Sequence, residues 1–408
     1  MSRYLFLTLI LVVFSTLAAS SVTQQLEDQM KQEEYTEVLV TFEKDIGNST
    51  VEDIDNHYSI EHEFSLIEGA KMNLTGSEIE NISSKQSVER IEPDYPVETL
   101  VSDTGEGFRM PDLHNNGYTG SNSSVAVLDT GIYDHDHLDI YKAEDFTEEG
   151  TGDLNGHGTH VAGIIGSQHP IYTGISPEID LYDAKVLNET GRGSSSQIIQ
   201  GLEWVVEEEV DIASISIGAE VERCNGRDML SRATNRATSS GTLTVTAAGN
   251  SGPENSTITA PGCALNTLTV GSVDKEDKMA SYSSRGPTYD NRVKPDVVAP
   301  GSDIVSTWPE NRWRYSSGTS MAAPHVSGQA AVILSETDKE PGEVKKKITG
   351  TSHDLGYPEN YQGSGKIDIY ESLEGNFTSI GQSTTERTGF FAALRNVWYR
   401  FVDFILWM

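Results

Sequence analysis

Residues 124–131 read Ser-Val-Ala-Val-Leu-Asp-Thr-Gly, an apolar run that ends in an aspartate. Buried strands of parallel sheets have this continuous apolar character, and functional residues follow them at the carboxyl end. Similar runs recur along the chain and alternate with predicted helices. Further strands are expected at 179–187, 211–217, 242–247 and 267–273, and helices at 158–165, 195–208, 228–239 and 320–334. This alternation predicts an α/β fold, a three-layer sandwich with a mostly parallel central sheet.

Four polar residues stand where this fold places functional groups. Asp129 and Asn250 follow predicted strands, and His157 and Ser320 stand where predicted helices begin. A serine hydroxyl becomes a nucleophile when an imidazole takes its proton and a carboxylate orients that imidazole. We therefore predict Ser320 as nucleophile, His157 as general base and Asp129 as its orienting carboxylate. The backbone N–H of Ser320 and the side-chain amide of Asn250 are the predicted oxyanion donors.

Metal binding is an alternative interpretation of two segments. His157 and His160 are three residues apart, but no glutamate or third ligand accompanies them in a zinc motif. The segment 134–139 contains three aspartates and two histidines and could hold a cation. A solvated acidic loop is the favoured interpretation of that segment. No metal is expected to take part in the chemistry.

Local sequence around the four residues resembles the subtilases, the subtilisin-like serine peptidases. The resemblance rests on residues 126–131, 155–160, 247–252 and 317–325, in which the Asp, His and Ser follow one another in the subtilisin order. It implies a subtilisin-like catalytic domain over residues 101–376. It also implies a serine endopeptidase that hydrolyses peptide bonds of proteins or peptides through an acyl-enzyme, without a cofactor.

The resemblance further implies where an extended peptide would bind. Segments 191–194 and 214–218 resemble the two edges between which subtilases hold a substrate by main-chain hydrogen bonds. Thr259 falls near the floor of the S1 pocket, where a smaller residue is common, so a narrowed pocket is expected. Segment 166–174 lacks the ligands of the family's calcium loop, and structural calcium stays an open alternative. The residues expected to bind substrate are Gly191, Gly193, Ser216, Ile217, Gly218, Ala248, Gly249 and Thr259.

Residues 21–100 are predicted to form a separate, small α+β domain. Strands are expected at 37–42, 69–74 and 87–94, helices at 51–58 and 77–85, and a linker from Pro93 and Pro96 to Gly107. The segment resembles the inhibitory propeptide of subtilases. That resemblance implies a self-processing precursor, cut by its own Ser320 between Val97 and Asp103, whose propeptide acts as an intramolecular inhibitor.

The N-terminus and the cysteines indicate export. Arg3, an apolar run and small residues up to Ser20 predict a signal peptide over residues 1–20, and a retained anchor is the weaker alternative because the run is short. Cys224 and Cys263 are the only cysteines, which suggests one disulfide in an oxidising compartment, with two buried thiols as the alternative. Sequons for N-glycosylation begin at Asn48, Asn73, Asn81, Asn122, Asn188, Asn255 and Asn376.

The chain is strongly acidic, and its C-terminal segment has a pattern of its own. The formal net charge is -33, from 62 acidic and 29 basic residues. This excess argues against nucleic acid as a partner and suggests a high-salt habitat, with an ordinary acidic secreted protein as the alternative. Residues 377–408 are expected to form a Ser/Thr-rich spacer and an amphipathic helix with aromatic residues on one side. Association with a membrane surface and docking on the catalytic domain both remain open for that helix.

Overall fold

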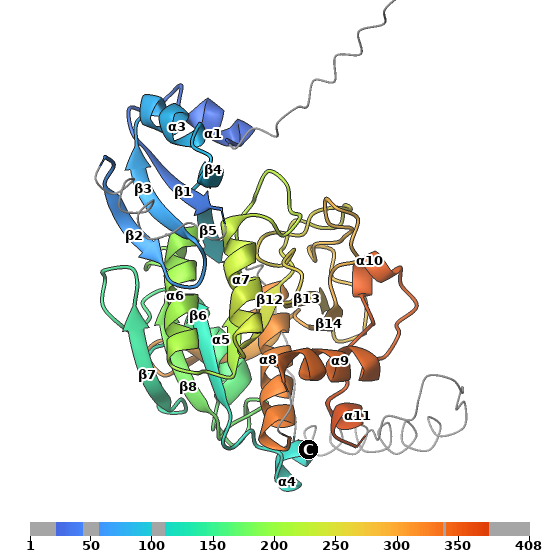
Figure 1. Cartoon of the computed structure of the whole chain (residues 1–408). Coiled ribbons are helices and arrows are strands. Elements are labelled where there is room, and N and C mark those ends of the chain that lie inside the picture. Colours follow the sequence, from blue (N-terminus) through green and yellow to red (C-terminus); the bar gives the residue numbers. More distant parts are fainter. Residues whose placement is uncertain (1–21, 44–56, 100–110, 338–339, 375–408) are drawn as a thin grey trace, which may run out of the picture. The chain divides into compact units, whose positions relative to one another are not determined.

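Seven parallel strands form the central sheet of a computed structural model that describes residues 22–43, 57–99, 111–337 and 340–374 (Figure 1). The strand order is β14-β13-β12-β10-β6-β8-β7, and every neighbouring pair is parallel. The predicted parallel α/β sandwich is confirmed. The strands are β14 (Val297–Pro300), β13 (Leu268–Val273), β12 (Leu243–Ala247), β10 (Ile212–Ile215), β6 (Ser124–Asp129), β8 (Asp180–Lys185) and β7 (Ile140–Asp145).

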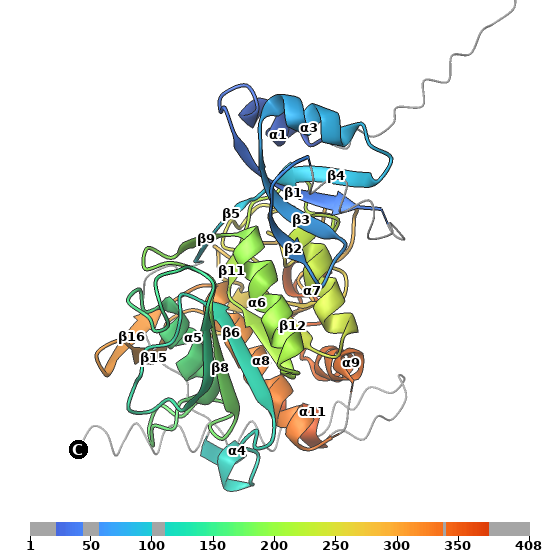
Figure 2. The ribbon, with the colours of Figure 1, turned by 60° about the vertical axis from the view of Figure 1, so that its left-hand side comes forward.

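Two hydrophobic cores lie on opposite faces of this sheet. Alternate residues of β6 point to opposite faces, as the period of a strand requires. Val125 and Val127 pack with the core that includes α5 and α8, whereas Ala126 and Leu128 pack with the core that includes α6 and α7 (Figures 1 and 2). The four helices are α5 (His157–Gly166), α8 (Thr319–Ser335), α6 (Ser195–Glu207) and α7 (Met229–Ser239).

Shorter elements surround the sandwich. An antiparallel hairpin, β15 and β16, follows β14, and four short helices lie before and after the central elements. Their bounds are β15 (Ile304–Trp308), β16 (Arg312–Ser316), α4 (Pro111–Asn115), α9 (Pro341–Thr351), α10 (Glu359–Gln362) and α11 (Ile369–Glu374). Among the described residues, none of the helices combines the length and the apolar character that crossing a bilayer requires.

The N-terminal region contains an antiparallel sheet with the order β2-β3-β1-β4. Its core includes Leu26 of α1 and Ile79 and Ile82 of α3, so two helices cover one face. The α+β character was expected, but β2 and α1 were not. The elements are β2 (Ile60–Phe64), β3 (Gly69–Leu74), β1 (Thr36–Phe42), β4 (Val88–Pro93), α1 (Gln24–Gln29) and α3 (Gly76–Ser83).

Two expectations about strands were wrong. The stretch containing Pro96, predicted as part of a linker, is strand β5 (Pro96–Thr99), the middle strand of a separate sheet with the order β11-β5-β9. The predicted strand at 211–217 divides after Ile215, and its end becomes β11 (Ile217–Gly218), which faces β9 (Arg192–Ser194) across β5. Because β5 finds its partners about 95–120 residues away in sequence, local composition does not reveal it.

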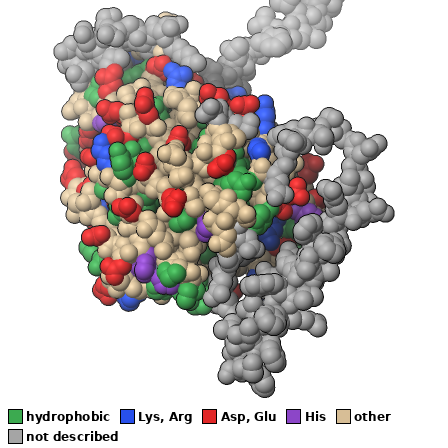
Figure 3. All heavy atoms as spheres, turned by 90° about the horizontal axis from the view of Figure 1, so that it is seen from below, with side chains coloured by type: hydrophobic (Ala, Val, Ile, Leu, Met, Phe, Trp, Pro, Cys, Tyr) green, Lys and Arg blue, Asp and Glu red, His purple; other side chains and the backbone are tan. Residues whose placement is uncertain are grey.

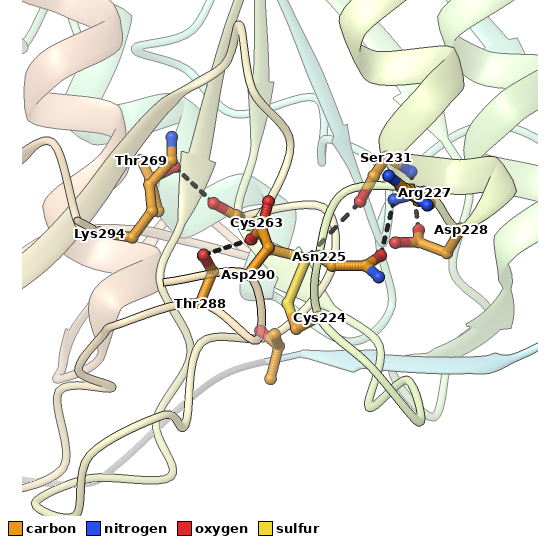
Figure 4. The surroundings of a disulfide bond; sticks show 12 residues. Cys224, Asn225, Arg227, Asp228, Ser231, Cys263, Thr269, Thr288, Asp290 and Lys294 are labelled. Carbon is orange, nitrogen blue, oxygen red and sulfur yellow. Dashed lines mark hydrogen bonds between the residues drawn. A yellow bond between two sulfur atoms is a disulfide. The ribbon is translucent and has the colours of Figure 1, made fainter. Parts of the chain in front are cut away.

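A disulfide joins Cys224 and Cys263, which are 39 residues apart (Figure 4). Hydrogen bonds to the backbone carbonyl groups hold both ends, since Tyr289 N–H donates to the Cys224 carbonyl and the Arg292 side chain donates through Nη2 to the Cys263 carbonyl. The bond therefore ties the segment after β11 to the loop before β13. The predicted signal peptide, the greater part of the helix expected at 51–58 and the C-terminal segment 377–408 lie outside the described residues.

Candidate active site

Asp129 and His157 form a buried pair at the carboxyl end of β6. His157 Nδ1 lies 2.6 Å from Asp129 Oδ1, and both side chains are at most 2% exposed. Because the carboxylate can only accept, the imidazole carries its proton on Nδ1 and leaves Nε2 with a lone pair. Among the described residues, Nε2 of His157 is buried and has no hydrogen-bond partner. His157 Nε2 is therefore able to accept a proton from a neighbouring group.

Two features position this pair: the backbone after His157 lies close to that of Gly131, and the buried carboxylate of Asp153 holds the start of α5. A Cβ on Gly158 would lie 2.2 Å from the carbonyl oxygen of Gly131, so only glycine fits at the residue after His157. Asp153 accepts hydrogen bonds from Gly156 N–H at 2.8 Å and from Thr159 N–H at 3.0 Å, and thereby holds the start of α5. Burial raises the pKa of Asp153. Sequence reasoning missed Asp153, although an aspartate shortly before a Gly-His pair is a signal for such a loop-holding role.

Ser320 occupies the first turn of α8 and contacts Ser216. Ser320 Oγ donates to the Ser216 carbonyl oxygen at 2.6 Å, and Ser216 Oγ donates to the Ser320 carbonyl oxygen at 3.0 Å. The hydroxyl thus points at the edge of β11 rather than bonding Nε2 of His157. Catalytic hydrogen bonds are often incomplete before a substrate is bound.

Asn250 lies beside the same helix start. Its side-chain oxygen accepts from Thr319 N–H at 3.0 Å and from Thr319 Oγ1 at 2.9 Å. This fixes the orientation of the amide and leaves Nδ2 buried without a hydrogen-bond partner in the described part of the chain. An unpartnered buried donor at the N-terminus of a helix suits a developing negative charge. Thr319, which the sequence did not single out, is the residue that orients Asn250.

Strand β5 of the N-terminal region lies between the two predicted substrate-binding edges and pairs with both. Val97 pairs with Gly193 on one side, and Glu98 pairs with Gly218 on the other. Thr99 pairs with Ile217, and its N–H donates to the Gly191 carbonyl at 3.1 Å. Four of the expected substrate-binding residues, Gly191, Gly193, Ile217 and Gly218, therefore contact a segment of the same chain in extended form.

Three further residues predicted to bind substrate, Ala248, Gly249 and Thr259, follow β12. Thr259 N–H donates to the Ala248 carbonyl at 3.1 Å. Gly249 has a positive φ of 110°, and a Cβ there would lie 2.9 Å from Thr259 Oγ1. The threonine side chain is thus placed against Gly249, where the narrowed S1 pocket was expected.

Hydrogen bonds engage His160 Nε2 and His169 Nδ1, in two of the segments considered for a metal ion. His160 Nε2 lies 3.0 Å from the carbonyl oxygens of Ile304 and Arg314, and burial lowers the pKa of His160 to about 3. In the segment considered for calcium, His169 Nδ1 accepts from two backbone N–H groups, so an imidazole closes that loop and no carboxylate is offered. Within the described ranges, no three His, Cys, Asp or Glu residues are grouped for a metal ion.

Comparison with known proteins agrees with this geometry. The family model of the subtilase family matches residues 120–365, and that of peptidase inhibitor I9 matches residues 11–100. The chain belongs to the subtilase family.

This subtilase is 34% identical over 376 residues to an alkaline protease of Alkalihalobacillus alcalophilus, a match covering 88% of this chain and 95% of the relative. It is 35% identical to the serine protease AprX of Bacillus subtilis, over 76% of this chain and 80% of that protein. It is 39% identical to subtilisin BL of Lederbergia lenta, over 64% of this chain and 94% of that protein. It is a subtilisin-like serine endopeptidase with an N-terminal I9 region.

Proposed function

We propose that this subtilase is a secreted, self-processing endopeptidase whose nucleophile is Ser320, with His157 as general base and Asp129 as its orienting group. The observation that carries the assignment is the 2.6 Å contact between Asp129 and His157, which leaves Nε2 as a lone-pair acceptor. His157 and Met321, the residue after Ser320, line one pocket. Asn250 Nδ2 and the backbone N–H of Ser320 would stabilise the oxyanion.

The reaction follows from these positions. Ser320 Oγ attacks the carbonyl carbon of the scissile bond while its proton passes to His157 Nε2. The tetrahedral oxyanion then collapses, the C–N bond breaks, and His157 returns the proton to the leaving amine. Water, deprotonated by the same imidazole, hydrolyses the acyl-enzyme and regenerates the serine.

The first substrate in this proposal is the chain itself. Thr99 pairs with Ile217, and Ser216, the residue before Ile217, contacts Ser320 through its carbonyl oxygen. Since this pairing leads along the chain toward Ser216 and hence toward Ser320, we propose that the chain is cut one residue beyond Thr99. The proposed self-processing site is therefore the Leu100–Val101 bond, within the interval expected from the sequence. Residues 21–100 would be the propeptide and residues 101–376 the catalytic domain.

Two carboxyl groups of the N-terminal region bind the N-termini of helices in the catalytic domain, which supports an inhibitory role for this region. Asp94 accepts from Ser196 N–H at 2.9 Å at the start of α6, and Glu92 accepts from Met229 N–H at 2.6 Å at the start of α7. The N-terminus of a helix favours a negative group such as that of Asp94, and Glu92 satisfies a backbone N–H that the helix itself leaves without a partner. After cleavage these contacts and the β5 pairing would keep the propeptide bound between β9 and β11.

A fluorophosphonate label and the processing state together test the proposal. The wild-type protein should react with the label and yield a new N-terminus at Val101. The Ser320→Ala variant should be unlabelled and accumulate as an uncut precursor. Processing of that variant when it is expressed alone, or a wild type that is never labelled at any salt concentration, would contradict the assignment.

Export and a high-salt habitat belong to the same proposal. The predicted signal peptide at residues 1–20 would direct secretion. Figure 3 shows carboxylates spread over one face, with few lysines and arginines among them. Since salt screens the repulsion within a chain of net charge -33, activity is expected to rise as salt is added. An activity that does not change with salt would argue for an ordinary acidic secreted enzyme.

A further inference from the structure

One residue of the strand that leads to the proposed self-processing site is charged and lies outside the core. Strand β5 runs between β9 and β11 (Figure 2), and along it Val97 is 1% exposed whereas Glu98 is exposed. Successive side chains of a strand point to opposite faces. A side chain in the position of Glu98 therefore points away from the core that holds Val97, toward solvent.

Arg192 of β9 lies opposite Glu98. The two strands are antiparallel, and their register pairs Glu98 with Arg192. One residue further along β5, Thr99 N–H donates to the Gly191 carbonyl at 3.1 Å. Hydrogen-bonded and non-hydrogen-bonded pairs alternate along such a ladder, so Glu98 and Arg192 form a non-hydrogen-bonded pair. In pairs of this kind the opposing side chains lie closest to each other.

The strand on the other side of β5 offers no side chain at this position. Glu98 pairs there with Gly218 of β11, and glycine has none. Of the two residues directly opposite Glu98, Arg192 alone therefore contributes a side chain. The chemistry of this residue determines which side chains are favoured in the position of Glu98.

The guanidinium of Arg192 is available to a ligand. Arg192 is exposed, and in the part of the chain that the structure describes neither its guanidinium nor the carboxylate of Glu98 has an ion-pair partner. Only the backbone of Arg192 is engaged, since its N–H donates to Asn188 Oδ1 at 3.0 Å and its carbonyl accepts from Asn188 N–H at 2.8 Å. These bonds fix the strand and leave the guanidinium able to bind a carboxylate with planar, two-pronged geometry.

We propose that Arg192 makes the position of Glu98 a subsite for an acidic side chain, that of the third residue before the scissile bond. The proposal rests on the proposed protease function and on cleavage after Leu100. It names the substrate class that the β9 edge selects, which is chains with Glu or Asp three residues before the cut. The enzyme's own propeptide carries Glu98 at this position.

Peptide anilides test the preference on the mature enzyme. The series is Val-Xaa-Thr-Leu-p-nitroanilide with Glu, Gln or Lys at Xaa, together with peptides that carry these residues in place of Val or of Thr. At the lowest salt at which the enzyme is active, kcat/KM should be about threefold higher for Glu than for Gln at Xaa, the size of an exposed ion pair, and lower for Lys than for Gln. In about 1 M NaCl the Glu-to-Gln ratio should approach one, because salt screens the pair.

Variants of Arg192 assign the preference to this side chain. Arg192→Lys keeps the charge and should keep a preference for Glu, whereas Arg192→Gln should bring the Glu-to-Gln ratio to about one. In Arg192→Glu the Lys peptide should be the better substrate. Arg236→Gln is the matched control, because it removes an exposed positive charge from the last turn of α7, outside β9 and β11, and should keep the wild-type ratio. Ratios within one variant do not depend on how much enzyme is active.

Cleavage of the Gln peptide separates failure of this proposal from failure of the protease function. An enzyme that cleaves it but does not prefer Glu at Xaa, that prefers Glu at a neighbouring position instead, or whose preference persists in Arg192→Gln overturns the subsite alone. A wild-type preference for Lys overturns it too, and assigns the selection to Glu189 and Glu220, which flank β9 and β11 in sequence. An enzyme that cleaves none of the peptides and takes no fluorophosphonate label overturns the protease assignment and the subsite with it.

Discussion

The side-chain oxygen of Asn250 accepts two hydrogen bonds from Thr319, one from the backbone N–H at 3.0 Å and one from Oγ1 at 2.9 Å. Thr319 directly precedes Ser320, so the proposed oxyanion donor and the proposed nucleophile are fixed to the same helix turn. The hydroxyl of Thr319 also accepts from Gly249 N–H at 3.2 Å, which connects the helix start to the segment that lines the predicted S1 pocket.

Substitution of Asn250 should lower kcat far more than it changes KM. Removal of the corresponding amide donor in subtilisin costs about 10²–10³ in kcat, and Asn250→Ala is expected to lose a comparable factor. Thr319→Val, which removes only one of the two bonds that orient the amide, should lose about tenfold. Thr319→Ser keeps the hydroxyl and serves as the control. Steady-state kinetics on Val-Glu-Thr-Leu-p-nitroanilide, after active-site titration with a fluorophosphonate, check this. An Asn250→Ala enzyme with wild-type kcat would exclude the oxyanion role.

Sequence predicted the central fold because its signals are local. The run that ends at Asp129 and the apolar helix after Ser320 are recognisable from their own residues, and the family's motifs place the His and the Asn. Strand β5 was missed because Pro96 indicates a linker, whereas its pairing with Gly193 and Gly218 depends on distant segments. Chain composition alone does not reveal partners of this kind.

The parts of the site that were missed share one cause. Asp153 and Thr319 act by orienting other residues, so their contribution becomes visible only when backbone donors and acceptors have positions. The position of Arg192 opposite Glu98 depends on the pairing of β9 with β5. Residue types without coordinates carry no information about such contacts.

Glu203 of α6 should hold the cleaved propeptide on the enzyme. Its carboxylate accepts from the backbone N–H groups of Ser65 and Leu66 and lies 3.2 Å from Nε2 of His62. Hydrogen bonds to a charged group contribute about 1.5–3 kcal/mol each, so Glu203→Ala should weaken retention of the fragment at least tenfold. Size-exclusion chromatography of the processed protein measures how much fragment co-elutes. Glu207→Ala, an exposed position on the same helix, should retain the fragment as wild type does, and equal retention in both variants would contradict the role of Glu203.

Loss of the Cys224–Cys263 disulfide should destabilise the folded chain. Closing a loop of this size contributes about 2–4 kcal/mol to the free energy of unfolding. Cys224→Ser with Cys263→Ser, made in the Ser320→Ala background to prevent autolysis, should therefore melt several degrees lower in calorimetry. The Ser320→Ala protein with a reductant should melt as the double variant does. A reductant that leaves the melting temperature unchanged would show that the bond does not contribute to stability.

Retention of the propeptide should weaken as the pH rises. Glu92 is buried beside Arg90 and Asp228, with Tyr95 and Glu222 nearby, and burial, reinforced by the charge of Asp228, raises its pKa from 4.5 to about 7 despite Arg90. Burial also raises the pKa of Asp228. A released propeptide would return Glu92 to its ordinary value, so the complex binds a proton that the free fragment does not.

The sign of this linkage sets the pH window. Protonation of Glu92 stabilises the complex of the cleaved fragment with the enzyme fully below pH 4.5, and this stabilisation is lost as the pH rises to about 7. The dissociation constant of the fragment should therefore increase at least tenfold between pH 5 and pH 8. Glu92→Gln, which mimics the protonated carboxyl, should flatten the profile. Glu89→Gln removes a more exposed ion pair with Arg232 from the same surface and should lower the affinity without changing the slope. Co-elution of the fragment at each pH measures the profile, and a wild-type slope in Glu92→Gln would assign the pH dependence to another group.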